Sequence, residues 1–270
     1  MPDAGRRQAG SLAERYLDAL SFLSRLVTRP GQTERRFQAC LSAFAPAGMT
    51  LGLFWTILAF AAMHFAAAAG VSPALSPLVG GWIWLLALLW TTRALHWDGV
   101  ADLADACGSG ASGERFWQIM RDSRLGAFGA LAVCAGLVGC LLLAAAHLEQ
   151  GNWLLLMLAP AWGRASSLLL AASAPPQGGG SLGRLVCSAM TPRLARQQRL
   201  WLAAMMLLTW LTGVPVWQVL LLLAGQCLLQ GKLRRTALDH GGLSGDFLGA
   251  DIELAQLWFL LALLCALRAC

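Results

Sequence analysis

Long uncharged stretches alternate with short charged ones along the 270-residue chain. No Asp, Glu, Lys or Arg occurs in residues 37–92, 125–148 or 200–231. A helix that crosses a bilayer needs ~20 mostly apolar residues, so these stretches are long enough for one or two crossings each. Together with the apolar segments between them, they predict seven membrane spans, at residues 47–69, 77–96, 127–148, 153–173, 199–213, 214–231 and 252–269.

The fifth and sixth predicted spans are short and share one uncharged stretch, which is interrupted at Gly213-Val214-Pro215. They form either a tight helical hairpin or a partly re-entrant pair, so a bundle of six spans stays an alternative. In both cases the pattern predicts an all-α, polytopic membrane helix bundle that forms a single domain over residues 1–270.

Composition supports a membrane protein and excludes several other classes. Residues of the AVILMFWYC set make up 57% of the chain and charged residues only 13%, against ~25% charged in soluble domains. These values exclude an ordinary water-soluble enzyme, a disordered chain and a disulfide scaffold. The twelve Trp and single Tyr fit the aromatic belts of membrane proteins, in which Trp gathers at the interfaces.

The net charge of +6 indicates an orientation rather than a nucleic-acid partner. Eighteen of the 20 basic residues fall in the N-terminal segment and in or beside alternate loops, among them Arg93, Arg121, Arg193 and Arg234. By the positive-inside rule, this predicts a cytoplasmic N-terminus and a working site on the cytoplasmic side. Within the N-terminal segment 1–45, residues 11–27 have amphipathic helical spacing, so this helix lies either on the inner membrane surface or against the bundle.

Three carboxylates recur at helical spacing just after the second predicted span. Asp98, Asp102 and Asp105 stand at i, i+4 and i+7, which places them on one face of a helix. Like charges stacked in this way repel each other, so a compensating positive group is expected. A Mg²⁺ ion fits, because it takes a few carboxylates together with water and phosphate oxygens. Arg partners are the alternative, and Asp98 acting as an N-cap would explain only one of the three.

Two arginines follow shortly after this cluster. Arg121 and Arg124 lie about one helical turn apart and are suited to gripping a phosphate group, although simple anchoring on the cytoplasmic side is an alternative. Asp122 between them either pairs with one of the arginines or joins the metal shell. His96 adjoins the carboxylates and is a candidate for phosphate contact or proton transfer.

A second polar segment spans residues 240–253 and is rich in glycine. Its Asp246 and Glu253 are seven residues apart and fit one helix face, while the alternative for Asp251 and Glu253 is a helix start, where the macrodipole favours acids. Arg164 stands in the middle of the fourth predicted span. A charge in the bilayer interior is costly, so Arg164 is expected to face the interior of the bundle, toward the carboxylates or a substrate anion.

The motifs of this chain resemble those of the cobalamin synthase family, the adenosylcobinamide-GDP ribazoletransferases. The resemblance is carried by Leu95-His96-Trp97-Asp98-Gly99-Val100-Ala101-Asp102-Leu103-Ala104-Asp105 and by Met120-Arg121-Asp122-Ser123-Arg124-Leu125-Gly126-Ala127-Phe128-Gly129. Residues 241–250 with Glu253, and residues 22–26, are also similar to family segments. Trp97, Ala106 and Ser244 depart from the residues usual in the family, but none of these departures removes a carboxylate.

This resemblance implies transfer of the phosphocobinamide unit of adenosylcobinamide-GDP onto α-ribazole or its 5′-phosphate, with release of GMP. It implies Mg²⁺ as cofactor and the bacterial cytoplasmic membrane as location, and an oligomer is compatible with it. The implied Mg²⁺ ligands are Asp98, Asp102 and Asp105, and one of these or Asp246 accepts the hydroxyl proton. Substrate contacts are expected from His96, Arg121, Asp122, Arg124, Arg164 and Glu253.

Two other functions share part of this pattern. A membrane prenyltransferase also uses Asp-rich helices with Mg²⁺ and a diphosphate, but it usually carries two such motifs, whereas the second segment here offers the lone Asp246 outside its helix-start acids. A polytopic transporter would place ionisable groups at mid-membrane and show internal repeats. Arg164 alone fits that expectation, and no repeat is evident.

Overall fold

The fold is a bundle of helices throughout the part of the chain that the structure describes. The computed structural model describes residues 10–31, 33–178 and 182–264, and within these ranges no strand forms apart from one isolated bridge between Pro176 and Leu243. The prediction of an all-α membrane bundle is confirmed. The helices are α2 (Leu12–Leu23), α3 (Glu34–Cys40), η1 (Leu41–Ala43), α4 (Phe44–Ala68), α5 (Ser76–Thr92), α6 (Leu95–Gly108), α7 (Gly113–Met120), α8 (Ala127–Glu149), α9 (Trp153–Ala171), α10 (Leu182–Ala189), α11 (Pro192–Leu211), α12 (Val216–Asp239) and α13 (Gly245–Ala262).

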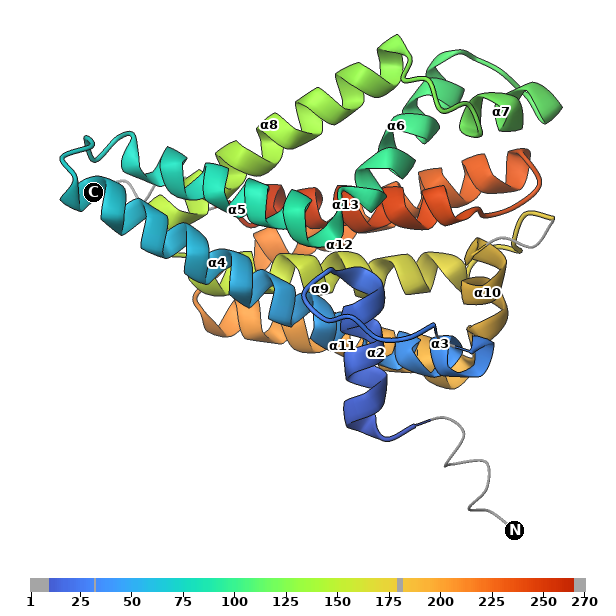
Figure 1. Cartoon of the computed structure of the whole chain (residues 1–270), viewed down its shortest axis with the longest axis horizontal. Coiled ribbons are helices and arrows are strands. Elements are labelled where there is room, and N and C mark those ends of the chain that lie inside the picture. The colour runs from blue at the N-terminus through green and yellow to red at the C-terminus, as the bar shows by residue number, and fades with distance from the viewer. Residues whose placement is uncertain (1–9, 32, 179–181, 265–270) are drawn as a thin grey trace.

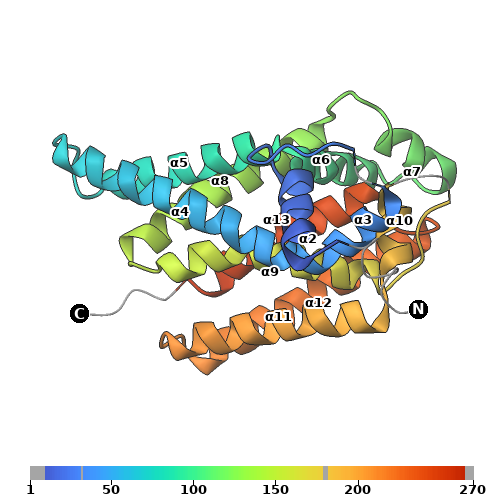
Figure 2. The same cartoon turned by 60° about the horizontal axis from the view of Figure 1, so that its bottom comes forward.

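Long helices α4, α5, α8, α9, α11, α12 and α13 fall on the seven predicted spans and run along the bundle (Figures 1 and 2). The end of the seventh predicted span, residues 265–269, lies outside the described residues. Of the helices in the described part, four are long and apolar enough to cross a membrane, or five if the bent pair α5–α6 counts as one span. The number is below seven because α11 carries arginines in its first turns and α13 carries three acids.

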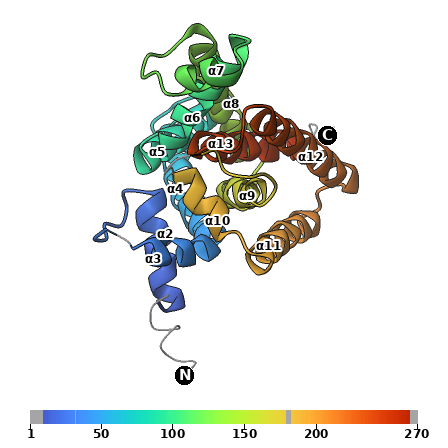
Figure 3. The same cartoon turned by 90° about the vertical axis from the view of Figure 1, so that its right-hand side faces the viewer.

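Helix α9 forms the centre of the bundle. It packs against α4, α11 and α13, which enclose it in the end-on view of Figure 3. Glycines allow this close packing: a Cβ at Gly48 of α4 would lie 2.7 Å from the carbonyl oxygen of Pro160, and a Cβ at Gly163 of α9 would collide with the carbonyl oxygen of Ile252. Small residues of this kind let membrane helices approach closely.

The loops sort to two ends of the bundle. The short α4–α5, α8–α9 and α11–α12 connections lie at one end, and α3, α7 and α10 lie at the other (Figure 2). Loops that the charge pattern assigned to one side of the membrane therefore share one end of the structure. The polar, long-loop end also contains α6 and the first turn of α13.

Helix α6 owes its direction to a sharp bend. The axes of α5 and α6 differ by 92°, and the bend is made by Arg93 and Ala94, which have φ angles of 58° and 53°. Residues other than glycine rarely adopt positive φ, and doing so costs free energy. The bend turns α6 away from the direction of α5 and lays it across the start of α13.

Helix α2 packs on the bundle near this end. Its buried face contains Ala19, Leu20 and Leu23, while Leu12 is largely exposed. Asp18 is buried and accepts hydrogen bonds from Arg36, with Arg29 within 3.1 Å. These ion pairs fasten α2 to α3 and to the segment that joins them. The predicted N-terminal segment begins at residue 1, and its first nine residues lie outside the described part.

Candidate active site

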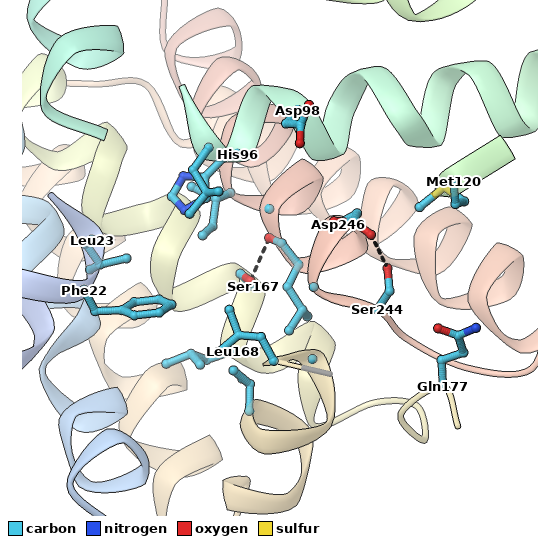
Figure 4. Close-up of a pocket in the computed structure, with 18 of the residues that line it drawn as sticks. Phe22, Leu23, His96, Asp98, Met120, Ser167, Leu168, Gln177, Ser244 and Asp246 are labelled. Atoms are coloured by element: carbon cyan, nitrogen blue, oxygen red, sulfur yellow. Dashed lines mark hydrogen bonds between the residues drawn. The ribbon is translucent and has the colours of Figure 1, made fainter. Parts of the chain in front are cut away.

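The carboxylates of α6 meet those of α13 where the two helices touch. Gly99 of α6 lies against the backbone of Asp246, because a Cβ at Gly99 would stand 2.7 Å from the Asp246 carbonyl oxygen. As a result Asp98 and Asp246 line one cavity of about 350 Å³ (Figure 4). Asp98 also lines a neighbouring cavity of about 310 Å³ together with Asp102.

Burial and the charges of neighbouring carboxylates raise the pKa of two acids in this group, Asp102 and Asp246. Burial, with the charges of Asp98, Asp246 and Asp105 added, raises the pKa of Asp102 to about 7. Burial also raises the pKa of Asp246, and the hydrogen bond from the Ser244 hydroxyl at 3.1 Å opposes that rise. The site therefore holds negative charge that no Arg or Lys of the described residues neutralises by an ion pair.

Asp105 is held by the start of α8 and lines neither of these two cavities. Its side-chain oxygens accept hydrogen bonds from the backbone N–H groups of Gly126 and Gly129, both at 2.8 Å. These N–H groups belong to the free donors of the N-terminus of α8. Asp105 thus caps α8 and fixes the loop that precedes it. The helical spacing of Asp98, Asp102 and Asp105 did not predict this role.

The loop between α7 and α8 brings the two arginines beside the carboxylates. Arg121 lines both cavities, and Arg124 lines the smaller one with Asp98 and Asp102. Asp122 pairs with Arg124, at 2.6 Å between Oδ2 and Nη2, and the hydrogen bonds from Arg124 lower the pKa of Asp122 to about 2. Of the two roles open to Asp122, the structure shows the arginine pair.

Helix α7 is itself tied to the glycine-rich segment before α13. The Trp117 indole N–H donates to the carbonyl oxygen of His240 at 2.8 Å, and the Phe116 ring stacks on His240 at 3.8 Å between ring centroids. These contacts hold α7, and the loop with Arg121 that follows it, beside the segment that precedes Asp246.

His96, Glu253 and Arg164 form a buried group behind the cavity. The His96 Nδ1 atom lies 3.2 Å from Glu253 Oε1. Arg164 is completely buried, donates from Nη1 to the Pro160 carbonyl oxygen, and lies over the Trp55 ring at 5.9 Å. Within the described part of the chain, its Nε and Nη2 groups have no hydrogen-bond partner, and neither does Glu253 Oε2. Of these three, His96 alone lines the larger cavity.

The chain matches a family model described as cobalamin-5-phosphate synthase over residues 15–264. The chain belongs to this family. A protein of Nitratidesulfovibrio vulgaris strain DP4, named adenosylcobinamide-GDP ribazoletransferase, is 38% identical over 87% of this chain and 90% of its own length. A protein of the same name from strain Miyazaki F is 36% identical over 91% of this chain and 92% of its own. No solved structure matches the chain.

Membership of the cobalamin-5-phosphate synthase family confirms that the chain is an enzyme of cobalamin synthesis. The structure brings together Asp98, Asp102, Asp246, Arg121 and Arg124 around the two cavities. Asp105, Glu253 and Arg164 lie outside that group, as cap and as buried support. Within the described residues, no three side chains of His, Cys, Asp or Glu converge closely enough to hold a metal ion by themselves.

Two features of this synthase escaped the sequence analysis. One is a buried polar network in which Ser166 donates to Asp251 at 2.8 Å and Gln230 donates to Ser166. Gln226 and Gln230, one turn apart within an apolar span, were the available signal. The other is the set of cavity-lining residues from distant segments, including Phe22, Trp117, Ser167, Gln177 and Val186, which no local spacing reveals.

Proposed function

We propose that this enzyme transfers the phosphocobinamide unit of adenosylcobinamide-GDP onto α-ribazole or its 5′-phosphate, and releases GMP. The name of the relatives, adenosylcobinamide-GDP ribazoletransferase, supports this choice of donor and acceptor. The observation that carries the proposal is that Asp98, Asp102 and Asp246 line two neighbouring cavities together with Arg121 and Arg124 at one end of the bundle. Carboxylates and arginines that line the same cavities suit a reaction in which a hydroxyl group attacks a diphosphate.

In the reaction, a ribose hydroxyl oxygen of the acceptor forms a bond to the phosphorus that carries cobinamide. The bond between that phosphorus and the oxygen bridging to GMP breaks, and GMP leaves with the bonding electrons. The hydroxyl proton passes to a carboxylate, for which Asp246 and Asp98 are suited because they line the same cavity. Arg121 and Arg124 hold the diphosphate and balance the charge that develops on the leaving nucleotide.

The residues present fit a Mg²⁺ ion. Asp98 and Asp102 line one cavity, and the pKa of Asp102 is raised by burial and by the neighbouring carboxylates, so a cation bound there would stabilise the ionised form. Mg²⁺ keeps several waters and commonly takes one or two carboxylates with substrate phosphate oxygens, so two protein ligands suffice. Asp98 and Asp102 would hold the ion, and when bound it supplies charge neutralisation at the phosphoryl oxygens.

The proposed function is tested by release of GMP from adenosylcobinamide-GDP by the purified protein. Release is expected only when α-ribazole and Mg²⁺ are both present. Asp102→Asn should lower turnover by at least about a hundredfold, since a ligand of the metal is lost, while Asp239→Asn, which alters an exposed acid of the same end, keeps it. A prenyltransferase or a transporter would release no GMP, and acceptor-independent release would overturn the transfer reaction.

We also propose that the polar end of the bundle faces the cytoplasm of a bacterial inner membrane. The support is the gathering of basic residues in the loops of that end. Reporter domains that are active only in one compartment, fused after Gly151 and after Gly242 in separate full-length chains, should report opposite sides. Reports from the same side would contradict this orientation.

A further inference from the structure

The larger cavity has two chemically different ends. It has a volume of about 350 Å³ and lies among α2, α6, α10 and α13. Figure 4 shows Phe22, Leu23 and Leu168 at one end, and Asp98, Asp246 and Ser244 toward the other. A ligand that fills it must therefore be apolar at one end and carry a polar, reactive group at the other.

The apolar end is built from four helices. Phe22 and Leu23 come from α2, Phe44 from α4, Leu168 from α9 and Val186 from α10. The Phe22 and Phe44 rings stack, with 5.8 Å between their centroids and 18° between their planes. None of these side chains offers a hydrogen-bond donor or acceptor, and flat aromatic walls favour a flat, apolar ring system.

The carboxylate end is where the reacting hydroxyl must lie. Asp246 accepts a hydrogen bond from Ser244 and shares the cavity with Asp98. His96 lies between the two ends, on the side of the cavity formed by α6. A sugar placed against Asp246 would direct its attached base toward Phe22.

We propose that this cavity binds the acceptor, α-ribazole, with its dimethylbenzimidazole ring between Phe22, Leu168 and Val186 and its ribose at Asp246 and Asp98. The inference rests on the proposed function and adds where the acceptor lies and which residues select it. A volume of about 350 Å³ is at the small end of the ~300–1,000 Å³ typical of ligand pockets. That size suits one nucleoside.

Neither half of the donor fits this cavity as well. The corrin macrocycle with its side chains is far larger than a nucleoside. Guanine is of suitable size, but at the apolar end its amide and amino groups would lie against Phe22, Phe44 and Val186, whose side chains offer no hydrogen-bond partner, and an unpaired buried polar group is costly. Dimethylbenzimidazole carries only one free ring nitrogen and two methyl groups, which an apolar wall accommodates.

Helix α2 is held firmly enough to act as a selective wall. The Asp18 carboxylate is buried, about one turn before Phe22 on the same helix, and is bonded to the guanidinium group of Arg36 at 2.9 Å. The Phe22 ring also packs edge-on against Phe37 of α3 at 4.9 Å. A wall fixed in this way selects among bases by shape and apolar area.

The test measures GMP release by the full-length enzyme in detergent while acceptor and donor are varied separately. Phe22→Ala should raise KM for α-ribazole by about tenfold or more, because stacking and apolar area are lost, and leave KM for adenosylcobinamide-GDP within about twofold. The matched control is Phe60→Ala, which alters a half-buried phenylalanine that packs on Trp153 away from this cavity. It should leave both KM values unchanged.

A second series uses the wild-type enzyme and therefore does not depend on the folding of a variant. An α-riboside of benzimidazole without methyl groups should show a KM about tenfold higher than α-ribazole, and one of adenine a still higher value. In Phe22→Ala the penalty for losing the methyl groups should shrink, since contacting groups couple.

Two results overturn the placement of the acceptor. One is a rise in the donor KM with an unchanged acceptor KM in Phe22→Ala, which would assign the cavity to the donor. The other is an equal KM for the methylated and unmethylated acceptors in the wild type. A wild-type enzyme that releases no GMP with α-ribazole would instead contradict the proposed function itself. That result is distinguishable, because the KM comparisons require a wild-type enzyme that releases GMP.

Discussion

The α-carbon of Gly99 lies so close to the backbone of Asp246 that a Cβ there would stand 2.7 Å from the Asp246 carbonyl oxygen. This contact sets the separation of α6 from α13, and therefore the separation of Asp98 from Asp246 across the cavity. The two carboxyl groups can act on one substrate only while the helices stay in register.

Gly99→Ala should therefore impair the reaction without touching a charged group. The added methyl group cannot be accommodated against backbone atoms, so α6 must shift, and a displacement of ~1 Å at reacting groups can cost ~100-fold in rate. We expect kcat for GMP release to fall at least about tenfold. Gly231→Ala, which adds a methyl group where nothing lies within 4 Å, is the control, and equal kcat values for the two variants would show that the contact does not position the carboxylates.

Asp105 should behave as a helix cap rather than as a metal ligand. Its oxygens accept the N–H groups of Gly126 and Gly129, and loss of such a cap costs ~0.5–2 kcal/mol. Asp105→Ala should lower the melting temperature in detergent, and Asp105→Asn, which keeps one acceptor oxygen, should restore part of it and most of the activity. If Asp105→Asn were as inactive as Asp102→Asn and no less stable than the wild type, Asp105 would belong to the metal shell.

The site of this enzyme should limit its stability at high pH. Burial and the charges of Asp98, Asp246 and Asp105 raise the pKa of Asp102 from 3.8 to about 7, so the folded protein binds a proton there that the unfolded chain releases. Stability is then lost as pH rises from about 4 through 7. Without Mg²⁺, Asp102→Asn should melt a few degrees above the wild type at pH 8 and close to it at pH 4.

Magnesium provides the matching control for this pH effect. Addition of Mg²⁺ at pH 8 should raise the melting temperature of the wild type, because a ligand that binds only the folded state stabilises it. It should have little effect on Asp102→Asn. A wild type that melts at one temperature from pH 4 to pH 8 without Mg²⁺ would contradict the raised pKa of Asp102.

The sequence was sufficient for the helices and for most of the site. Uncharged stretches and the apolar segments between them located the seven long helices, because a helix that crosses lipid needs ~20 mostly apolar residues. The helical period of 3.6 residues per turn placed Asp98 and Asp102 on one helix face. The Gly-rich segment around Asp246 was identified as a second part of the site. Within the described residues, four or five of these helices are long and apolar enough by themselves to cross a membrane.

Two features were out of reach because they depend on contacts between distant segments. The turn at Arg93 and Ala94 contains neither glycine nor proline, so nothing local predicts the 92° bend that redirects α6. The partners of Asp105 lie more than 20 residues further along the chain, and helical spacing cannot show that a cap takes it out of the carboxylate group.

Arg164 and Glu253 should depend on each other for the stability of the bundle. Both are buried, their charges interact, and among the described residues the Arg164 Nε and Nη2 groups have no hydrogen-bond partner. Removing one of two interacting buried charges leaves the other less compensated, whereas replacing both is milder.

We therefore expect Glu253→Gln to lower the melting temperature and the folded yield in detergent, and Arg164→Met to lower them as well. The double variant Arg164→Met/Glu253→Gln should be more stable than the sum of the single effects predicts, with a coupling of ~0.5–3 kcal/mol. The measurement is a double-mutant cycle of thermal unfolding, with His96 unchanged throughout so that its bond to residue 253 is altered equally in both variants that carry Gln. Additive effects would mean that Arg164 is stabilised by the Pro160 carbonyl oxygen and the Trp55 ring alone.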